Sequence, residues 1–558
     1  MAERRRSGPT GSPLVLTLLI VALLVTAAVA CSGGGSDGDG NGSDRDGGGG
    51  GDPGEHVAAG TFRMGTTAIE SLDPADVVLT DQVGMQLADL LFDGLVAPGP
   101  TGDAVVAGLA EAWTVDDAGT TWRFQLDPDR RFSDGSRVTA ADVAFTLERL
   151  AKRGSTSLTG VRLEVLDGYL AFLDGSAPSI SGVKIVDEAT LELITRVPYQ
   201  PLPAMLASPA YGIVPKPVVE ADPEGFVRDP VGSGPWEIGG RSDGTLRLEP
   251  VAARIGGTGD GDTDGVVDVI EVVPYADVVE VYEAHQAGEL DWAQVPVRYL
   301  EEEASDLGDR LVATPFHAEF FLAFNLSDDA LADPRMREAI VRAIDREAIA
   351  EEFVTGGIPL DGTVVDGIPG FEADGSPCGD RCIHDPDRAR ALVSEVHPDG
   401  DVPEIQVDFY DGETEEAITQ AVVDDLVAVG IPAVARIRPF EEYRSFVVGE
   451  DQQLFGFGWV GVAPDGESYL GPLFSSTSLD NVTGLASQAV DDAIAAARGE
   501  RDAAARQSAY VAAEAAVMAE LPIVPLAQVR THVVLSERVG EYSQRLDGTF
   551  DVAALELA

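Results

Sequence analysis

The sequence predicts an α/β protein, and three observations support this fold class. Segments in which apolar and polar residues alternate, as in half-buried strands, lie between segments with the apolar spacing of helices. The chain has 558 residues, of which 44% are hydrophobic and 24% are charged, a composition typical of globular proteins. This length is enough for two or more domains of roughly 100 to 200 residues each.

Local patterns predict the elements of the first half of the chain. Apolar and polar residues alternate across 121–126, which favours a strand with one buried face. A helix follows, because Thr139 and Asp142 have the spacing of a capping box and apolar residues continue at helical spacing to Leu150. Strands are also expected at 245–249 and 266–275.

Aspartates mark the starts of four helices in the second half. Asp333 and Asp385 each precede a proline, which suits the first turn of a helix. Asp345 is expected to cap the helix that follows the first of these, and Asp502 begins a helix that ends before a proline. Residues 523–532 then have the apolar, β-branched composition of a buried strand.

The charge balance excludes one class of partner. The chain carries 38 basic and 95 acidic side chains, which gives a formal net charge of −57. Nucleic acid is therefore not expected as a partner, because its phosphates would be repelled. The acidic surface is compatible with adaptation to high external salt and equally with a compositional bias of the genome.

The N-terminus has the features of an export signal. A positive cluster at Arg4–Arg6 precedes an apolar run over 13–30, and small residues stand directly before Cys31. This arrangement resembles the lipobox of bacterial lipoproteins, although Ala28 occupies the position where leucine is usual. We therefore predict a signal peptide over 1–31 with a lipidated Cys31, and a flexible Gly/Ser/Asp-rich tether over 32–56. The alternative is an uncleaved anchor helix.

Two cysteines remain after Cys31, and both lie in one turn-rich loop. Cys378 and Cys382 are four residues apart. An exported protein enters an oxidising compartment, so a disulfide between them is the favoured interpretation. A zinc site that adds His384 and Asp385 is the alternative, since the ligand types occur in a plausible order.

One acidic segment matches the pattern of a calcium-binding loop. Asp260, Asp262 and Asp264 precede Gly265, and Glu271 completes the spacing. The flanking segments are predicted as strands, so the helices of an EF-hand are missing. Ca²⁺ is thus a possible ligand and a solvated hairpin loop is the alternative, with no cofactor required.

Motifs of common hydrolases are not convincing here. Gly-x-Ser-x-Gly occurs at 34–38 and 240–244, but neither copy has the strand-to-helix turn that exposes a nucleophilic serine. The sequence also lacks an HExxH zinc motif, a Walker loop and a dinucleotide fingerprint. An extracellular hydrolase is therefore the weaker alternative to a binding protein.

Short motifs follow one another in a specific order from Phe62 to Tyr542. They occupy 71–74, 91–95, 108–113, 121–126, 131–135, 138–143, 232–236, 287–291, 323–326, 333–340, 343–346, 456–459 and 521–526. Each is weak alone, but their shared order is a strong signal. It resembles the extracytoplasmic solute-binding proteins of peptide- and nickel-type ABC importers, solute-binding protein family 5.

The resemblance implies a two-lobed, periplasmic-binding-protein-like type II fold with an extra domain in one lobe. Lobe 1 would contain domain I, assembled from 57–94, 200–312 and 536–558, and domain II over 95–199. Lobe 2 would be domain III, over 313–535. Such a fold closes around a ligand by a hinge motion.

The implied function is capture, without chemical change, of a peptide or peptide-like small solute in the interlobe cleft. The protein would be a monomer, lipid-anchored at the extracytoplasmic face of the membrane, and would deliver its ligand to ABC permease and ATPase subunits. A lipoprotein that senses a ligand without transporting it is an alternative. Nickel is less expected, because the six histidines form no cluster.

The resemblance also points to candidate ligand contacts. In the relatives, the segment after a Gly-Trp pair lines the cleft, which implicates Trp459, and an aspartate beyond it receives the peptide's amino terminus. Val462 occupies the aligned position here, and the nearest carboxylate is Asp465. A role of Trp459 in the core is the alternative. Further candidates are Thr66, Thr67 and Tyr211.

Overall fold

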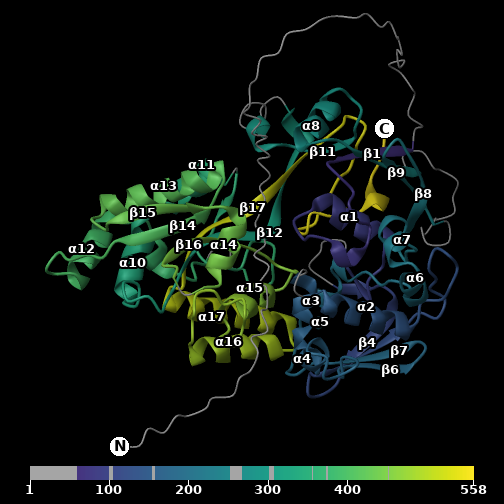
Figure 1. Ribbon diagram of the computed structural model, residues 1–558, viewed down its shortest axis with the longest axis horizontal. Coiled ribbons are helices and arrows are strands. Elements are labelled where there is room, and N and C mark those ends of the chain that lie inside the picture. The colour runs from purple at the N-terminus through teal and green to yellow at the C-terminus, as the bar shows by residue number, and fades with distance from the viewer. Residues whose placement is uncertain are drawn as a thin grey trace, which may run out of the picture.

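The computed structural model describes residues 60–99, 105–153, 158–251, 267–300, 307–354, 356–371, 375–449 and 451–558. Two lobes lie side by side and are joined by long strands (Figure 1). Within the described part, no helix combines the length and apolarity needed to cross a bilayer. The predicted signal peptide, Cys31 and the tether over 32–56 fall outside the described residues, so these remain predictions.

A mixed sheet of 11 strands runs through both lobes in the order β15-β14-β16-β12-β17-β11-β1-β10-β9-β8, with β13 paired to β17. Its lobe 1 strands are β1 (Thr61–Thr66), β8 (Trp236–Ser242), β9 (Thr245–Pro250), β10 (Val269–Pro274) and β11 (Trp292–Gln294). Its lobe 2 strands are β13 (Ile358–Pro359), β14 (Ile405–Tyr410), β15 (Ala433–Arg438) and β16 (Leu454–Val460). The strands shared by both lobes are β12 (Leu311–Phe324) and β17 (Ile523–Leu535).

Helices surround the sheet in both lobes (Figure 1). Lobe 2, drawn in green, carries α10 (Pro334–Ala343), α11 (Arg346–Phe353), α12 (Pro386–Val396), α13 (Glu413–Ala428), α14 (Phe440–Val447), α15 (Glu467–Phe474), α16 (Gln488–Gly499) and α17 (Ala503–Glu520). Domain I carries α1 (Gln82–Leu91), α6 (Lys216–Ala221), α7 (Pro223–Arg228) and α8 (Val278–Gln286).

Domain II lies below domain I in Figure 1 and has its own sheet, in the order β4-β5-β7-β6. These strands are β4 (Ala110–Val115), β5 (Thr121–Leu126), β6 (Val183–Asp187) and β7 (Thr190–Ile194). They pack with α2 (Ala140–Lys152), α3 (Leu158–Arg162) and α4 (Tyr169–Leu173). The hairpin of β2 (Val96–Pro98) and β3 (Val105–Ala107) and helix α5 (Leu202–Leu206) lie on the side toward lobe 2.

The local sequence signals are confirmed. Strand β5 buries its alternate residues, and Thr139 and Asp142 form the expected capping box at the start of α2. The four predicted aspartate caps all accept backbone N–H groups, at Asp333, Asp345, Asp385 and Asp502. Such caps satisfy N–H groups that the first turn of a helix leaves without partners.

The two lobes are joined through the pair β12 and β17. Leu311–Pro315 pairs with 530–534 on the lobe 1 side, whereas 319–323 pairs with 523–528 on the lobe 2 side. The register shifts between Pro315 and Glu319, so three residues of β12 face one residue of β17. The boundaries predicted at 312/313 and 535/536 thus fall within β12 and at the end of β17, because both strands continue through the joint.

The segment 240–244 forms a hairpin turn between β8 and β9. Asp243 and Gly244 both have positive φ angles, 50° and 88°. This is the backbone twist that two-residue hairpins favour. Ser242 therefore sits at the end of a strand and not at a strand-to-helix elbow, in agreement with the sequence-based argument against a hydrolase.

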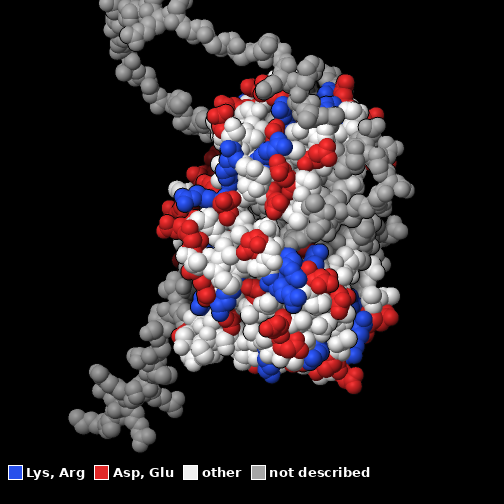
Figure 2. All heavy atoms as spheres, turned by 90° about the vertical axis from the view of Figure 1, so that its right-hand side faces the viewer, with Lys and Arg blue, Asp and Glu red and all other residues white. Residues whose placement is uncertain are grey.

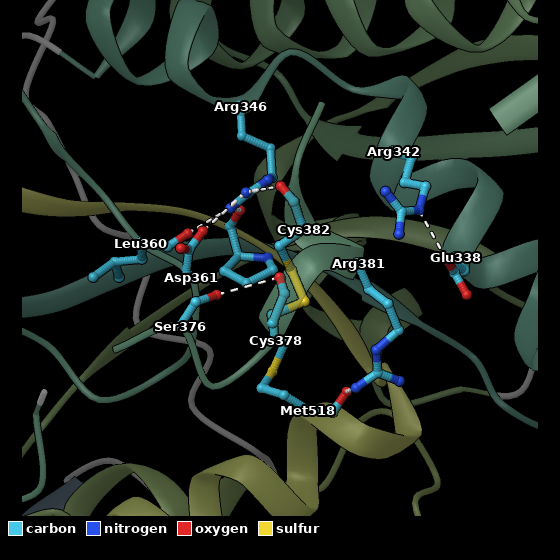
Figure 3. The surroundings of a disulfide bond; sticks show 12 residues. Glu338, Arg342, Arg346, Leu360, Asp361, Ser376, Cys378, Arg381, Cys382 and Met518 are labelled. Carbon is cyan, nitrogen blue, oxygen red and sulfur yellow. Dashed lines mark hydrogen bonds and ion pairs between the residues drawn. A yellow bond between two sulfur atoms is a disulfide. The ribbon is translucent and has the colours of Figure 1, made fainter. Parts of the chain in front are cut away.

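The disulfide loop, residues 375–382, contacts helices α11 and α17 of lobe 2 (Figure 3). Cys378 and Cys382 form a buried disulfide with their Cα atoms 5.6 Å apart. Arg346 on α11 donates to the carbonyl of Cys382, and Arg381 donates to the Met518 carbonyl at the end of α17 at 2.9 Å. Both thiols are consumed by the bridge, which removes them from the alternative zinc site.

Close packing in β16 explains one of the glycines in the Gly-Phe-Gly-Trp motif. A Cβ atom at Gly456 would lie 1.9 Å from the ring of Phe409, which itself stacks on Phe320 with centroids 5.5 Å apart. Gly456→Ala is therefore expected to lower the free energy of unfolding by about 1–3 kcal/mol through overpacking. Urea unfolding measures this loss. Gly499→Ala is the control, since its Cβ would make only ordinary contact, at 3.6 Å; equal stability of the two variants would contradict the packing argument.

Candidate functional site

A pocket opens at the joint between the lobes, and we call it the interlobe pocket. It has about 560 Å³ of atom-free space, part of it open to solvent. The β2–β3 hairpin supplies Pro98 and Val105, and helix α5 with the residues that follow it supplies Ala204, Ala207 and Ser208. Lobe 2 supplies Val462, Ala463 and Pro464, strand β12 supplies His317, and the C-terminal segment supplies Arg545, Leu546 and Asp547. Apolar walls with a few polar groups are typical of small-molecule sites.

The structure brings some predicted contacts together at this pocket. Val462 lines it directly. Tyr211 is buried in the hydrophobic cluster that also contains Val462, and its hydroxyl donates to the Thr159 carbonyl at 2.8 Å. Thr66 and Thr67 lie apart from this group, at the end of β1 beside β10. Thr67 is exposed, and the carbonyl of Thr66 accepts from Tyr275 N–H at 2.8 Å.

Trp459 lies in the hydrophobic core of lobe 2 and does not line the interlobe pocket. It is 4% exposed, and its Nε1–H donates to the Ser468 carbonyl at 2.7 Å. The guanidinium of Arg162, which comes from α3 in lobe 1, stands over its ring at 5.5 Å. Trp459 therefore contributes to packing and to the contact between the lobes.

Asp465 is enclosed within lobe 2. Its carboxylate accepts from the Glu467 backbone N–H at 3.0 Å and lies 3.9 Å from Arg506. Burial raises the pKa of Asp465, and its hydrogen bonds and the Arg506 charge offset only part of this rise. Glu467 pairs with Arg498 at 2.6 Å. These groups support the segment that carries Val462, but their carboxylates do not line the pocket.

Direct polar contacts also link the two lobes outside the β12–β17 joint. Arg162 of domain II forms an ion pair with Asp480 of lobe 2, and both side chains are at most 10% exposed. The backbone N–H of Gln200 donates to the Arg498 carbonyl at 3.0 Å. Arg501 reaches back to the Asp116 carbonyl. The two lobes are thus connected by the β12–β17 joint and by this second set of contacts.

Several pocket residues could not be found by the sequence reasoning. His317 was one of six scattered histidines, and Arg545 and Asp547 lie in a C-terminal segment without a recognisable motif. The backbone of His317 donates to the Leu546 carbonyl at 2.9 Å and accepts from Gly461 N–H at 2.9 Å. This residue therefore joins three chain segments that are far apart in the sequence.

The burial of His317 is expected to lower the free energy of unfolding at acid pH. Burial lowers its pKa to about 4, against an opposing influence of the Asp547 charge. As the pH falls from about 6.5 to 4, the unfolded chain binds a proton at this site that the folded chain does not, so stability decreases. His317→Gln should remove on the order of 2 kcal/mol of this decrease. Urea unfolding at pH 7 and pH 4.5 measures it.

The comparison with the wild type isolates this one group. His285 and His532 also have pKa values lowered to about 4 by burial, but they are present in both proteins and cancel. The matched control is His397→Gln, on the partly exposed end of α12. Identical pH dependence of the wild type and His317→Gln would show that the imidazole is not held uncharged.

The predicted calcium site is only partly described. Asp260, Asp262 and Asp264 lie outside the described residues, so binding of Ca²⁺ stays a prediction. Glu271 lies in β10, and its carboxylate is paired with Arg63 at 2.9 Å and with Arg247 at 3.8 Å. Among the described residues, no group of three or more His, Cys, Asp or Glu side chains is arranged to hold a metal ion.

Comparisons with known proteins agree with this architecture. Residues 104–481 match the model of bacterial extracellular solute-binding proteins, family 5 Middle. The glutathione-binding protein GsiB of Salmonella typhi is 25% identical over 491 residues, which cover 86% of this chain and 89% of the relative. The periplasmic murein peptide-binding protein MppA of Escherichia coli K12 is 25% identical over 472 residues, covering 82% and 85%.

Solved structures show the same fold. The unliganded open form of the murein tripeptide-binding protein MppA superimposes with a TM-score of 0.76 at 22% identity, covering 90% of this chain and 98% of that one. The OppA protein of Burkholderia pseudomallei gives a TM-score of 0.67 at 24% identity, covering 90% and 100%. The predicted two-lobed fold and family are thus confirmed: the chain belongs to the bacterial extracellular solute-binding proteins of family 5.

Proposed function

We propose that this protein is the substrate-binding component of an ABC importer and captures a peptide or peptide-like small solute in the interlobe pocket. The observation that carries the proposal is the pocket itself, whose walls come from both lobes and from the strand that joins them. A ligand that contacts both lobes favours the arrangement in which they are together. GsiB is a glutathione-binding protein and MppA is a murein peptide-binding protein, which supports this ligand class.

The surroundings of the pocket support binding without catalysis. Its lining is mainly apolar, and its polar members are Ser208, His317, Arg545 and Asp547. Ser208, His317 and Asp547 are the residue types of a nucleophile, a base and an orienting group. Among the described residues, however, Asp547 bonds to Thr549 and the His317 Nε2 has no partner, so they do not form a connected set. The ligand is therefore expected to be released unaltered. Mass spectrometry of ligand recovered from the protein measures this directly.

The binding proposal is tested by a thermal-shift and calorimetric screen of the purified protein. Peptides, glutathione, murein peptides, oligosaccharides, opines and metal chelates form the panel, and one class is expected to raise the melting temperature. Ala204→Trp should block the pocket, because Ala204 lines it from α5 and is only partly buried. Ala428→Trp, at an exposed position on α13, is the matched control. Equal affinity of both variants would reject the pocket assignment.

Delivery to a permease and membrane anchoring belong to the same proposal. We propose that Cys31 carries the lipid and that the protein acts as a monomer with permease and ATPase subunits. Uptake of the identified ligand by cells, with and without the gene, separates import from sensing.

Metabolic labelling with a fatty acid, compared between the wild type and Cys31→Ala, tests the anchor; equal labelling would reject it. Calorimetric titration with Ca²⁺, compared with Asp262→Ala, tests the calcium loop.

A further inference from the structure

The joint between the lobes presents one side chain to the interlobe pocket. The register of β12 against β17 moves from Pro315 opposite Arg530 to Glu319 opposite Gln528, so His317 lies in an irregular stretch of β12. Irregularities of this kind change the direction of a side chain beside binding sites. The carbonyl of His317 accepts from Gly461 N–H at 2.9 Å and from the Tyr469 hydroxyl at 2.8 Å. Its position is therefore fixed by groups of lobe 2 as well as lobe 1.

The imidazole of His317 has an unused hydrogen-bonding atom. The residue is 3% exposed, and within the described part of the chain its Nε2 has no hydrogen-bond partner. Buried polar atoms are nearly always paired, and an unpaired one in a native structure calls for an explanation. Because His317 lines the interlobe pocket, a ligand atom is the partner that this position lacks.

The charged neighbours of His317 indicate what kind of ligand atom this is. Arg545 donates to Asp89 at 3.1 Å and to the Thr549 hydroxyl at 2.8 Å. Asp547 lines the pocket, and one of its oxygens accepts from the N–H and hydroxyl of Thr549 at 3.0 and 2.7 Å. The charge of Arg545 is offset by Asp89, and Asp547 adds a further negative charge to the pocket lining near the imidazole, which suits a cation.

Arg545 adds a second requirement. Its Nε–H is buried and has no partner among the described residues, although its terminal nitrogen is engaged. A cation alone would leave this donor unsatisfied. A ligand that has a hydrogen-bond acceptor, such as a carbonyl oxygen, next to its cationic group would satisfy both. The apolar residues Val462, Pro464 and Leu546 would then cover the rest of the ligand.

We propose that His317 and Asp547 determine ligand specificity by binding an ammonium group that stands next to a carbonyl-type acceptor, with Arg545 facing the acceptor. The proposal rests on the proposed function and deepens it, because it assigns recognition to the joint strand and the C-terminal segment. The aligned carboxylate position, Val462, then forms part of an apolar wall. The neutral state of His317 supports the assignment of an ammonium group. Burial lowers the pKa of His317 to about 4, and a protonated ring would repel the ammonium.

The test uses a tripeptide mixture with free amino termini and the same mixture after N-acetylation. Thermal shift and calorimetry are measured on the wild type, Asp547→Asn, His317→Phe and the control His397→Gln. The free mixture should bind the wild type and the control, and acetylation should abolish binding. Asp547→Asn and His317→Phe should weaken binding roughly tenfold to a hundredfold, the usual effect of losing a hydrogen bond to a charged group.

The possible outcomes separate this inference from the proposed function. Equal binding of the acetylated and free mixtures, or unchanged affinity of both variants, overturns the ammonium assignment and leaves the binding function intact. The same holds if an amine-free solute of the wider panel proves to be the ligand. Failure of the wild type to bind any member of that panel overturns both. Asp547→Asn keeps the test decisive if His317→Phe fails to fold, because Asp547 is only partly buried in a turn.

Discussion

Asp480→Ala is expected to loosen the contact between the lobes. Asp480 pairs with Arg162 across the interface, and the two side chains are 10% and 8% exposed. The variant leaves a buried guanidinium without its counter-charge, and such a loss typically costs about 3–5 kcal/mol. The cost falls on the arrangement in which the lobes touch, because separation returns Arg162 to water. Ligand affinity should therefore fall and the lobes should separate, while each lobe keeps its own core.

Small-angle scattering and hydrogen exchange measure this effect. The radius of gyration of Asp480→Ala should rise, and amides around 158–162 and 475–485 should exchange faster than in the wild type. Asp480→Asn is the milder control, because it keeps the side-chain shape and one acceptor oxygen. The exchanged pair, Arg162→Asp with Asp480→Arg, should recover part of the loss. Unchanged scattering and exchange in Asp480→Ala would show that the ion pair does not hold the lobes together.

Trp459→Ala is expected to destabilise lobe 2. Trp459 is 4% exposed in β16, and its loss removes a large buried ring together with the hydrogen bond to the Ser468 carbonyl. Truncation of a buried tryptophan to alanine usually costs about 3–5 kcal/mol. The midpoint of urea unfolding should therefore fall sharply. Trp459→Phe, which keeps an aromatic ring but loses the N–H donor and part of the buried volume, should show a smaller loss.

This variant also decides between the two interpretations that the sequence left open for Trp459. If Trp459 contacts the ligand, the Trp459→Ala protein would lose the ligand response and keep the stability of the wild type. If Trp459 is a core residue, the variant would be less stable, and any loss of ligand affinity would follow from that lower stability. A Trp459→Ala protein with the wild-type unfolding midpoint and no ligand response would thus contradict the packing role described above.

Local features of the fold were predictable because their causes lie within a few residues. The caps at Asp333, Asp345, Asp385 and Asp502 depend only on an aspartate placed before the first turn, and the alternation in β5 shows directly which face is buried. The two-lobed fold was predictable for a different reason. It followed from the order of the motifs, which reflects the family and not the physics of any one segment.

The binding pocket was only partly predictable, because its walls come from distant parts of the chain. Val462 was found through its place after the Gly-Trp pair. His317 and Asp547 are 230 positions apart in the numbering and meet only after β12 and β17 have paired, so no local pattern marks them. Trp459 shows the opposite difficulty. Its motif indicated a site, but the ring is buried between the core of lobe 2 and Arg162 of lobe 1 and does not line the pocket.

The position of β17 in the sheet constrains when the protein can finish folding. This strand is synthesised late, yet it lies between β12 and β11, in the interior of the strand order. Residues 523–528 complete the sheet of one lobe, and 533–535 complete that of the other. Neither half can close while the ribosome is still producing the preceding 500 residues or so. The nascent chain thus remains unfinished through most of its synthesis, because these non-local strand pairings form only after the last strand has been made.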